Sequence, residues 1–468
     1  MQETRWTVPK IIYTSLMGFL LLGYLYVIAI YKDPTSTGQT FQFSAPFWIL
    51  RVITAVMGIV LGKLWKDKGF WILIAYLLLK IIRVAIPNPD NLLDSAVSDI
   101  LLTGLWVFCA CYGLGHVLSE TQLRQFLRVC AAIWTIGMVI YASLGVYAAW
   151  TDQTVYNLSK GGLWGINVDR LFLVYYVTVS GSVLSLAVVI ALCSAATSRH
   201  VWTKVLYILS VIPMLVALSL TDSRCAQVTV ATGTATLVGI LLLNAFRRKA
   251  IPGSQLPGRR PWYAWPVSIA VTGLVFVAIV LGVMKTISVF NSLKTAGGLL
   301  PRALAEETGE AAKTVMSNRG YTGSDLFTSR PMIWKAALTY ISENPLLLLT
   351  GASILNPMAG VNAVPSLTFM AAHCHCMPLM IILENGIPGL LIVIAFLVLT
   401  AVRSFQLVNG NRPTAQKIFP ALVISILAGE LIECFTWLRS GTSPVLPFLF
   451  VFVGIIHSFS TVSRNTEL

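Results

Sequence analysis

Long apolar runs recur from one end of the chain to the other, and they constrain its fold more than any motif does. Each is about 17 to 25 residues long, the length at which an α-helix crosses the hydrocarbon core of a bilayer. Apolar residues make up 56% of the 468 residues and charged residues only 11%, which argues against a soluble globular enzyme. We therefore predict an all-α polytopic membrane protein of about twelve transmembrane helices. The runs are 9–31, 46–64, 69–86, 97–118, 128–150, 170–196, 201–220, 225–246, 263–286, 378–402, 418–438 and 441–460.

The positive charge is distributed unevenly between the connections. The formal net charge of +14 would suggest nucleic acid in a soluble protein. Here lysine and arginine gather in alternate connections, such as 63–68 and 247–249, which is typical of the cytoplasmic loops of membrane proteins. We infer no nucleic-acid partner, and we predict that both termini are cytoplasmic.

The same alternation predicts three parts of the chain. Residues 1–286 carry nine transmembrane helices, residues 287–377 form one long loop on the outer side, and residues 378–468 carry three further helices and a cytoplasmic tail. Loops of this length are usually lids or binding elements. Within it we predict an exposed helix over 301–317 and a second helix, which has Ser329 as N-cap and Pro331 in its first turn and ends before Asn344.

Six basic residues are predicted to cluster at the outer face, where the chain supplies few acidic partners. Asp222, Glu384, Glu430 and Glu433 are the nearest carboxylates. An excess of cations at this depth predicts an anion that the sequence does not encode, and guanidinium groups bind phosphates by paired hydrogen bonds. A phosphate or pyrophosphate is the natural ligand, and the headgroups of ordinary membrane lipids remain the alternative. The six are Arg51, Lys80, Arg83, Arg170, Arg224 and Arg330.

His373 and His375 stand where the long polar segment meets an apolar run. Histidine titrates near physiological pH, so the pair is a candidate site, although a surface pair without a function fits as well. A helix beginning near Cys376 would direct its free N–H groups toward the same region. Glu384 falls on the opposite side of that helix, so we predict a structural role for it at the bend from Gly386 to Gly389. The eight cysteines predict no disulfide framework.

Several short motifs together resemble the O-antigen ligase and O-antigen polymerase superfamily. The resemblance extends to the predicted helices and the single large outer loop, and Cys376 and Pro378 depart from the family's usual asparagine and aromatic residue. The motifs are His373-x-His375-x-x-x-Leu379 with Glu384, Gly386, Pro388 and Gly389, Ser329-Arg330-x-x-x-Trp334, Thr221-x-Ser223-Arg224, and Gly165 to Arg170.

The resemblance implies a C-type glycosyltransferase on the outer face of the bacterial plasma membrane, working without a metal or another cofactor. Its partners would be a polyprenyl-pyrophosphate-linked oligosaccharide donor, a glycan or lipid-glycan acceptor, and membrane lipids. His375 matches the essential histidine, Arg224 and Arg330 match the arginines that hold the pyrophosphate, and His373 matches a position that is often histidine. We expect Arg170, Arg51, Lys80 and Arg83 to contribute to substrate binding, and Trp334 to be structural.

Two other interpretations were weighed. A transporter or flippase of lipid-linked sugars would also need cations, but it would favour inverted repeats, and none is visible in the sequence. A metal site at His373, Cys374, His375 and Cys376 does not match the usual zinc spacing, which leaves two to four residues between cysteines. The resemblance does not separate a ligase from a polymerase, because the two differ in their acceptor.

Overall fold

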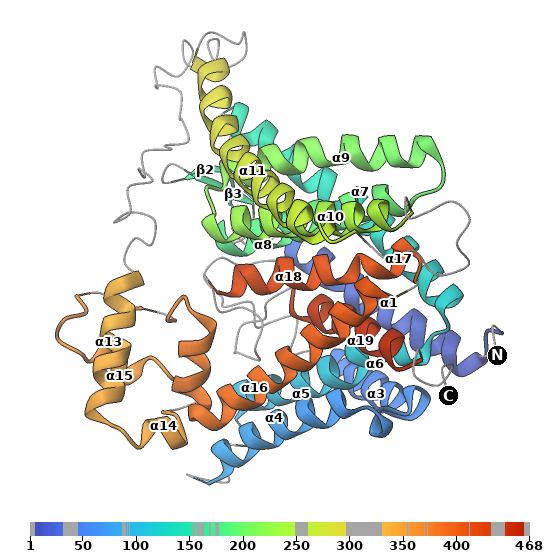
Figure 1. The fold of residues 1–468 in the computed structure, drawn as a ribbon. Helices are drawn as coiled ribbons and strands as arrows, with labels where there is room; N and C mark the ends of the chain where they lie inside the picture. The colour runs from blue at the N-terminus through green and yellow to red at the C-terminus, as the bar shows by residue number, and fades with distance from the viewer. Residues whose placement is uncertain are drawn as a thin grey trace.

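The structure is a computed structural model. Most of its helices lie together in one large body, and a smaller helical unit lies at one side (Figure 1). The residues that it describes are 5–30, 45–86, 90, 92, 94–151, 155–156, 163–167, 170–173, 177–248, 261–295, 330–352, 354, 356–368, 370–371, 373–410, 412–431 and 445–462. The first half holds α1 (Val8–Ile30), α3 (Ala45–Gly62), the 3-10 turn η1 (Leu64–Lys66), α4 (Lys68–Ala85), α5 (Ser95–Leu105), the π-helical η3 (Trp106–Cys111), α6 (Tyr112–Val117), α7 (Glu120–Trp150), β1 (Val155–Tyr156), β2 (Leu163–Asn167), β3 (Arg170–Leu173), α8 (Val177–Thr197) and α9 (Val201–Leu220). The second half holds α10 (Arg224–Arg248), α11 (Ala264–Thr295), α13 (Arg330–Glu343), α14 (Leu347–Thr350), α15 (Ala359–Asn362), α16 (Met377–Asn409), α17 (Thr414–Lys417), α18 (Phe419–Glu430) and α19 (Leu446–Val462).

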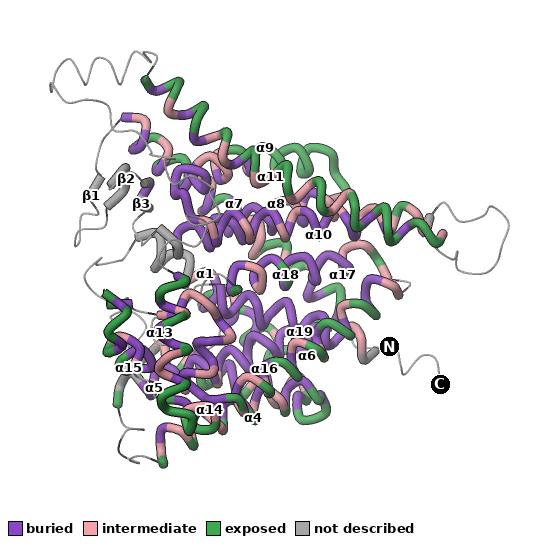
Figure 2. Tube along the Cα trace, turned by 60° about the vertical axis from the view of Figure 1, so that its left-hand side comes forward, coloured by how far each residue is buried: buried purple, intermediate pink, exposed green. Residues whose placement is uncertain are grey.

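Each apolar run predicted from the sequence overlaps a helix. Among the described residues, seven helices are long and apolar enough to cross a membrane, and α1, α3 and α19 contain shorter apolar helices. The helical architecture is therefore confirmed, whereas the count of about twelve spans stays a prediction. Apolar side chains on α9 and α11 face outward, among them Trp202 at 79% and Leu274 at 71% exposed (Figure 2). Such surfaces are expected where lipid rather than water surrounds a helix.

A small antiparallel sheet interrupts the helices in the order β1-β2-β3. Asn167 pairs with Arg170, and Trp164 pairs with both Val155 and Leu173. The prediction that a helix begins at Arg170 is therefore wrong, because this residue opens β3 and α8 starts only at Val177. Residues 163–167 form a strand of only five residues, too few for a stable helix of their own.

Two helices extend beyond their apolar runs because polar groups fix their ends. Ser119 caps α7 by accepting a hydrogen bond from the Gln122 backbone N–H at 3.5 Å, and the Gln122 side chain accepts in return from the Ser119 N–H at 3.1 Å. This capping box starts the helix at Glu120 rather than at the predicted 128. The buried Lys294 side chain near the end of α11 donates to the Ala149 carbonyl of α7 at 2.7 Å, which satisfies an otherwise open helix-end acceptor.

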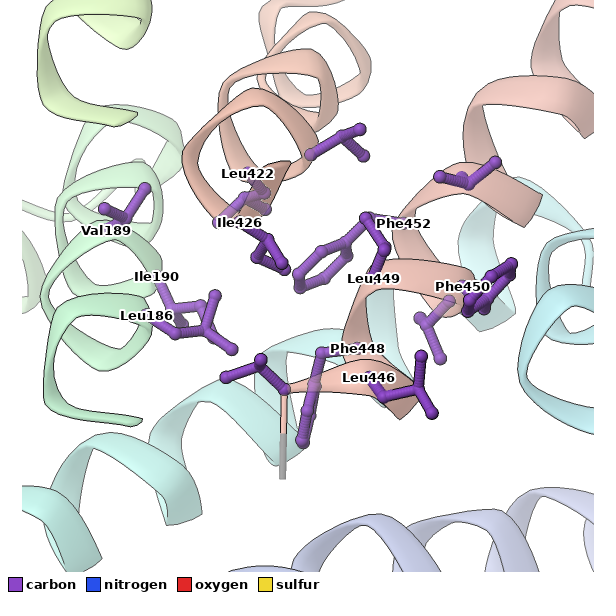
Figure 3. Close-up of a cluster of buried hydrophobic side chains, with 14 of the residues drawn as sticks. Leu186, Val189, Ile190, Leu422, Ile426, Leu446, Phe448, Leu449, Phe450 and Phe452 are labelled. Carbon is purple, nitrogen blue, oxygen red and sulfur yellow. The ribbon is translucent and has the colours of Figure 1, made fainter. Parts of the chain in front are cut away.

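The main core lies where α8, α18 and α19 meet (Figure 3). Apolar side chains from the three helices interdigitate there, including Ile190, Leu422 and Phe448. The π-helical turn η3 is buried along its whole length and packs against α3 and α19. Between helices in a membrane, such packing stabilises the fold through van der Waals contacts, because lipid is as apolar as the core.

A second, separate core holds α13, α15 and the start of α16 together. Figure 1 shows α13, α14 and α15 on one side of the helices, away from both termini. The predicted second loop helix is confirmed as α13. Ile333, Ala337 and Ile341 of its apolar face are buried as expected, but Leu338 is 59% exposed. The predicted helix over 301–317 and the proposed cap Ser329 lie outside the described residues.

Candidate functional site

The histidine pair directly precedes α16. His375 adopts a left-handed backbone conformation, with φ of 50°, so it stands outside the helix rather than on one of its faces. The His375 backbone N–H donates to Nδ1 of His373 at 3.3 Å, and the two ring centroids lie 3.9 Å apart. Both rings are half-buried.

Three contacts hold the histidine segment from the inside of the second core. The Trp334 indole N–H donates to the Cys374 carbonyl at 2.8 Å. Cys374 is fully buried, and its Sγ lies 3.5 Å from the sulfur of Met358. The Asn362 side chain binds both the N–H and the carbonyl of Ala371, at 2.9 and 3.0 Å. The segment is thus anchored on one side, which leaves the imidazoles on the other.

The first turn of α16 presents backbone donors beside His375. Cys376 is the N-cap residue, and its side chain makes no capping hydrogen bond. Free N–H groups and the positive end of a helix dipole favour an anion or a developing negative charge. The prediction that a helix begins near Cys376 is confirmed, and the left-handed conformation of His375 turns the chain directly before it.

Arg330 reaches the same region through α13. It is the first residue of that helix and is 9% exposed. Residues four apart on a helix share a face, so Arg330 lies one turn from Trp334, which contacts Cys374 directly. The structure therefore places Arg330 on the helix that contacts the histidine segment through Trp334.

Arg224 stands at the start of α10, after a tight turn. Asp222 has φ of 46°, and the Ser223 hydroxyl accepts from the Ala226 N–H at 3.5 Å, which caps the helix. At the far end of α10, Arg247 donates to the Asn409 carbonyl at the end of α16, at 3.0 Å. The two helices thus meet at their ends.

Residues 209–394 match a family model described as O-antigen ligase. This match supports the resemblance to the O-antigen ligase and O-antigen polymerase superfamily. The matched range runs from α9 to α16 and includes Arg224, Arg330, His373 and His375. No curated protein matches the chain. The match supports, at family level, a multi-pass membrane glycosyltransferase with a lipid-linked oligosaccharide donor and a glycan acceptor.

Four predicted substrate cations lie outside the range that matches the O-antigen ligase family. Arg51 is buried and pairs with Asp99 at 3.4 Å, and it also donates to Thr103 at 3.2 Å. Lys80 is buried and pairs with Glu384 at 2.9 Å. The predicted excess of cations is therefore smaller by two, because Glu384, one of the expected carboxylates, neutralises Lys80, and Asp99, which was not among them, neutralises Arg51. The others are Arg83, which donates to the Leu349 carbonyl, and Arg170, whose backbone lies in β3.

The bend of α16 accounts for the residue types at Glu384, Gly386 and Gly389. Gly386 has φ of 68° and ψ of −171°, a region that is essentially restricted to glycine. A Cβ there would lie 2.7 Å from the Leu349 carbonyl oxygen, so α14 packs directly on the bend. A side chain at Gly389 would meet Asn385. Glu384 pairs with Lys80 of α4 just before the kink, and its structural role stays a prediction.

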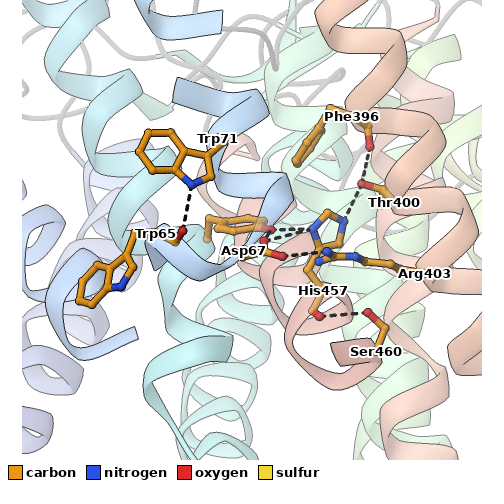
Figure 4. A network of polar contacts seen from close by, with 9 residues as sticks. Trp65, Asp67, Trp71, Phe396, Thr400, Arg403, His457 and Ser460 are labelled. Carbon is orange, nitrogen blue, oxygen red and sulfur yellow. Dashed lines mark hydrogen bonds and ion pairs between the residues drawn. The ribbon is translucent and has the colours of Figure 1, made fainter. Parts of the chain in front are cut away.

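A buried polar network at the opposite end of α16 was not predicted (Figure 4). Asp67 accepts from Arg403 at 2.7 Å and from the Tyr112 hydroxyl, which also contacts Nδ1 of His457 at 2.6 Å. Thr400 contacts the other nitrogen of His457 at 3.0 Å. Burial alone would raise the pKa of Asp67, but the hydrogen bonds from its partners hold this pKa well below its ordinary range. Arg403 is thus a buried partner of Asp67 and not a solvated basic residue.

Proposed function

We propose that this protein transfers or polymerises oligosaccharide from a polyprenyl-pyrophosphate carrier onto a hydroxyl of a glycan or lipid-glycan acceptor. The reaction takes place on the outer face of the bacterial plasma membrane, with both termini cytoplasmic, and inverts the anomeric centre. His375 acts as general base, while Arg224 and Arg330 bind the pyrophosphate.

The observation that carries the proposal is the placement of His375. Its left-handed backbone lifts it off the helix that follows, and Trp334 fixes the preceding carbonyl at 2.8 Å. The imidazole is half-buried, so a substrate hydroxyl can reach it while the segment behind it stays rigid. A general base needs this combination of accessibility and fixed position.

Positive charge near His375 supports a departing pyrophosphate. Arg330 lies one turn from Trp334, and Arg224 opens α10, whose other end meets the end of α16. The first turn of α16 adds backbone N–H groups. Fixed donors of this kind stabilise negative charge as it develops on a leaving group.

The transfer is a single displacement. A nitrogen of the neutral His375 ring takes the proton of the acceptor hydroxyl, and the acceptor oxygen forms a bond to the anomeric carbon. The bond from that carbon to the pyrophosphate oxygen breaks, and its electron pair leaves with polyprenyl pyrophosphate. Arg224 and Arg330 hold the charge that this oxygen gains.

The test is an in vitro transfer assay with His375→Asn. Asparagine tolerates the left-handed conformation better than alanine, so this variant removes the base while the backbone keeps its shape. We expect transfer to fall about 10²- to 10⁴-fold, the usual contribution of a general base, with an unchanged melting temperature. His373→Asn is the matched comparison and should lose less. Near-normal transfer by folded His375→Asn would eliminate His375 as the base.

The arginines are tested in the same assay. Arg224→Ala and Arg330→Ala should both reduce transfer strongly, whereas Arg5→Ala, which removes an exposed arginine near the N-terminus, should not. A loss of equal size in all three would contradict specific binding of the pyrophosphate. Movement of the lipid-linked sugar across vesicles without glycan extension would favour the transporter interpretation. The acceptor that is extended decides between ligase and polymerase.

A further inference from the structure

A polar cavity of about 270 Å³ opens between the end of α8 and the start of α9. It is lined by Arg128 of α7 and by Arg199 and His200 of the connection between α8 and α9. The hydroxyl groups of Ser198 and Thr203 line it as well. In the described part of the chain, neither arginine forms an ion pair with a carboxylate. The cavity therefore carries a net positive charge that the described residues do not neutralise.

The start of α9 adds hydrogen-bond donors to this cavity. His200 is the N-cap residue of this 20-residue helix, and its side chain makes no capping hydrogen bond. The N–H groups of the first turn are open for a ligand, and helix starts favour anions. Two guanidinium groups and a helix start together fit a phosphate group.

A second cavity, of about 300 Å³, adjoins the first and is mostly apolar. Ile190, Leu422, Phe448 and Phe452 line it, so it lies within the apolar cluster of Figure 3. The two cavities share four lining residues, Arg128, Ser194, Thr197 and Arg199. A basic pocket thus continues into an apolar one. Arg124, also at the apolar cavity, already pairs with Glu120 at 2.8 Å.

We propose that the two cavities together bind one anionic glycerophospholipid. Its phosphate lies between Arg128 and Arg199 at the start of α9, and one acyl chain enters the apolar cavity. The charge and the apolar lining match the two ends of such a molecule, whereas free phosphate would leave the apolar cavity unused.

This site is distinct from the proposed transfer site. Pro413, Ala415 and Gln416, which line the apolar cavity, follow the end of α16, whereas His375 directly precedes its start. The part of α16 after the bend at Gly386, residues 387–409, alone spans about 35 Å at 1.5 Å per residue. The bound lipid therefore acts from the opposite end of the helix bundle, as a ligand that stabilises the fold by mass action.

The experiment measures the melting temperature of the delipidated full chain in detergent with added lipid. Dioleoyl phosphatidylglycerol should raise it, dioleoyl phosphatidylcholine less, and glycerol 3-phosphate not at all. Arg128→Ala/Arg199→Ala should weaken the phosphatidylglycerol effect about thirtyfold in concentration, because each basic contact is worth about fivefold. Lys66→Ala/Lys204→Ala removes the same charge from exposed positions outside both cavities and should leave the effect unchanged.

A third variant tests the acyl chain. Ala131→Phe narrows the apolar cavity and keeps both arginines, so it should abolish the phosphatidylglycerol effect without lowering the melting temperature of the delipidated protein. Three results would overturn the proposal. The first is an equal loss of the phosphatidylglycerol effect in both double variants. The second is a rise in melting temperature with glycerol 3-phosphate as large as with phosphatidylglycerol. The third is an undiminished phosphatidylglycerol effect in Ala131→Phe.

Discussion

The Trp334 indole N–H lies 2.8 Å from the Cys374 carbonyl oxygen and joins the first turns of α13 to the residue directly before His375. This bond fixes the backbone on one side of the proposed base. Trp334→Phe keeps most of the packing and removes only the donor. We expect a loss of about 0.5 to 1.5 kcal/mol in unfolding free energy. We also expect a larger relative fall in kcat than in affinity for the acceptor, because the position of His375 matters most in the transition state.

The control is Trp202→Phe on α9, where the indole is 79% exposed. It should change neither the melting temperature nor the rate of transfer. Unchanged kcat in folded Trp334→Phe, measured by steady-state transfer, would show that this bond does not position His375.

Gly386 provides the second prediction. Its backbone conformation is one that other residues avoid, and a Cβ would lie 2.7 and 2.8 Å from the carbonyl oxygens of Leu349 and Leu348. Gly386→Ala should therefore destabilise the protein by at least about 1 to 3 kcal/mol, the cost of the backbone strain alone. Thermal unfolding in detergent measures this. Gly282→Ala in α11, where a Cβ meets nothing within 4 Å, should be neutral or slightly stabilising.

Lys80 and Glu384 form a buried ion pair at 2.9 Å. Glu384→Gln alone leaves a buried lysine without its counter-charge and should cost about 3 to 5 kcal/mol. Lys80→Met/Glu384→Leu removes both charges and should recover most of that stability and the transfer activity, if Glu384 is only structural. Unfolding and transfer are measured on both variants. A stable double variant that transfers nothing would instead assign Glu384 or Lys80 a part in the reaction.

The sequence predicted those helices whose ends carry a local signal, such as a proline or a change from polar to apolar residues. Pro331 near the start and Asn344-Pro345 after the end defined α13, and the border between polar and apolar segments located α16. The sheet was missed because β1 has two residues and β2 has five, too few for a strong alternation. Pairing between strands depends on neighbours that a single segment does not reveal.

The partners of the buried cations could not be predicted from the sequence alone. Asp99 lies within an apolar run, 48 residues from Arg51, and only the packing of α3 against α5 brings the two together. The left-handed conformation of His375 was equally hidden, since histidine adopts it only occasionally. Motifs in the sequence therefore suggested which residues are candidates. The partners and backbone conformations of these residues could be found only from the structure.

The Asp67 network predicts how stability depends on pH. Hydrogen bonds from His457, Arg403 and Tyr112 outweigh burial and lower the pKa of Asp67 below its ordinary value of 3.8. A carboxyl with a lowered pKa contributes stability above its unfolded pKa and loses it as the pH falls through and below that value. The melting temperature of the wild-type protein should therefore drop as the pH falls below about 4, partly through Asp67. Asp67→Asn should be less stable at pH 7 and lose less stability on acidification, because it has no carboxyl at position 67 to protonate.

Melting temperatures from pH 3 to pH 7 measure both effects. Glu343→Gln, which changes an exposed carboxyl, should follow the wild-type profile. An Asp67→Asn profile parallel to that of the wild type would show that Asp67 contributes nothing to the acid sensitivity.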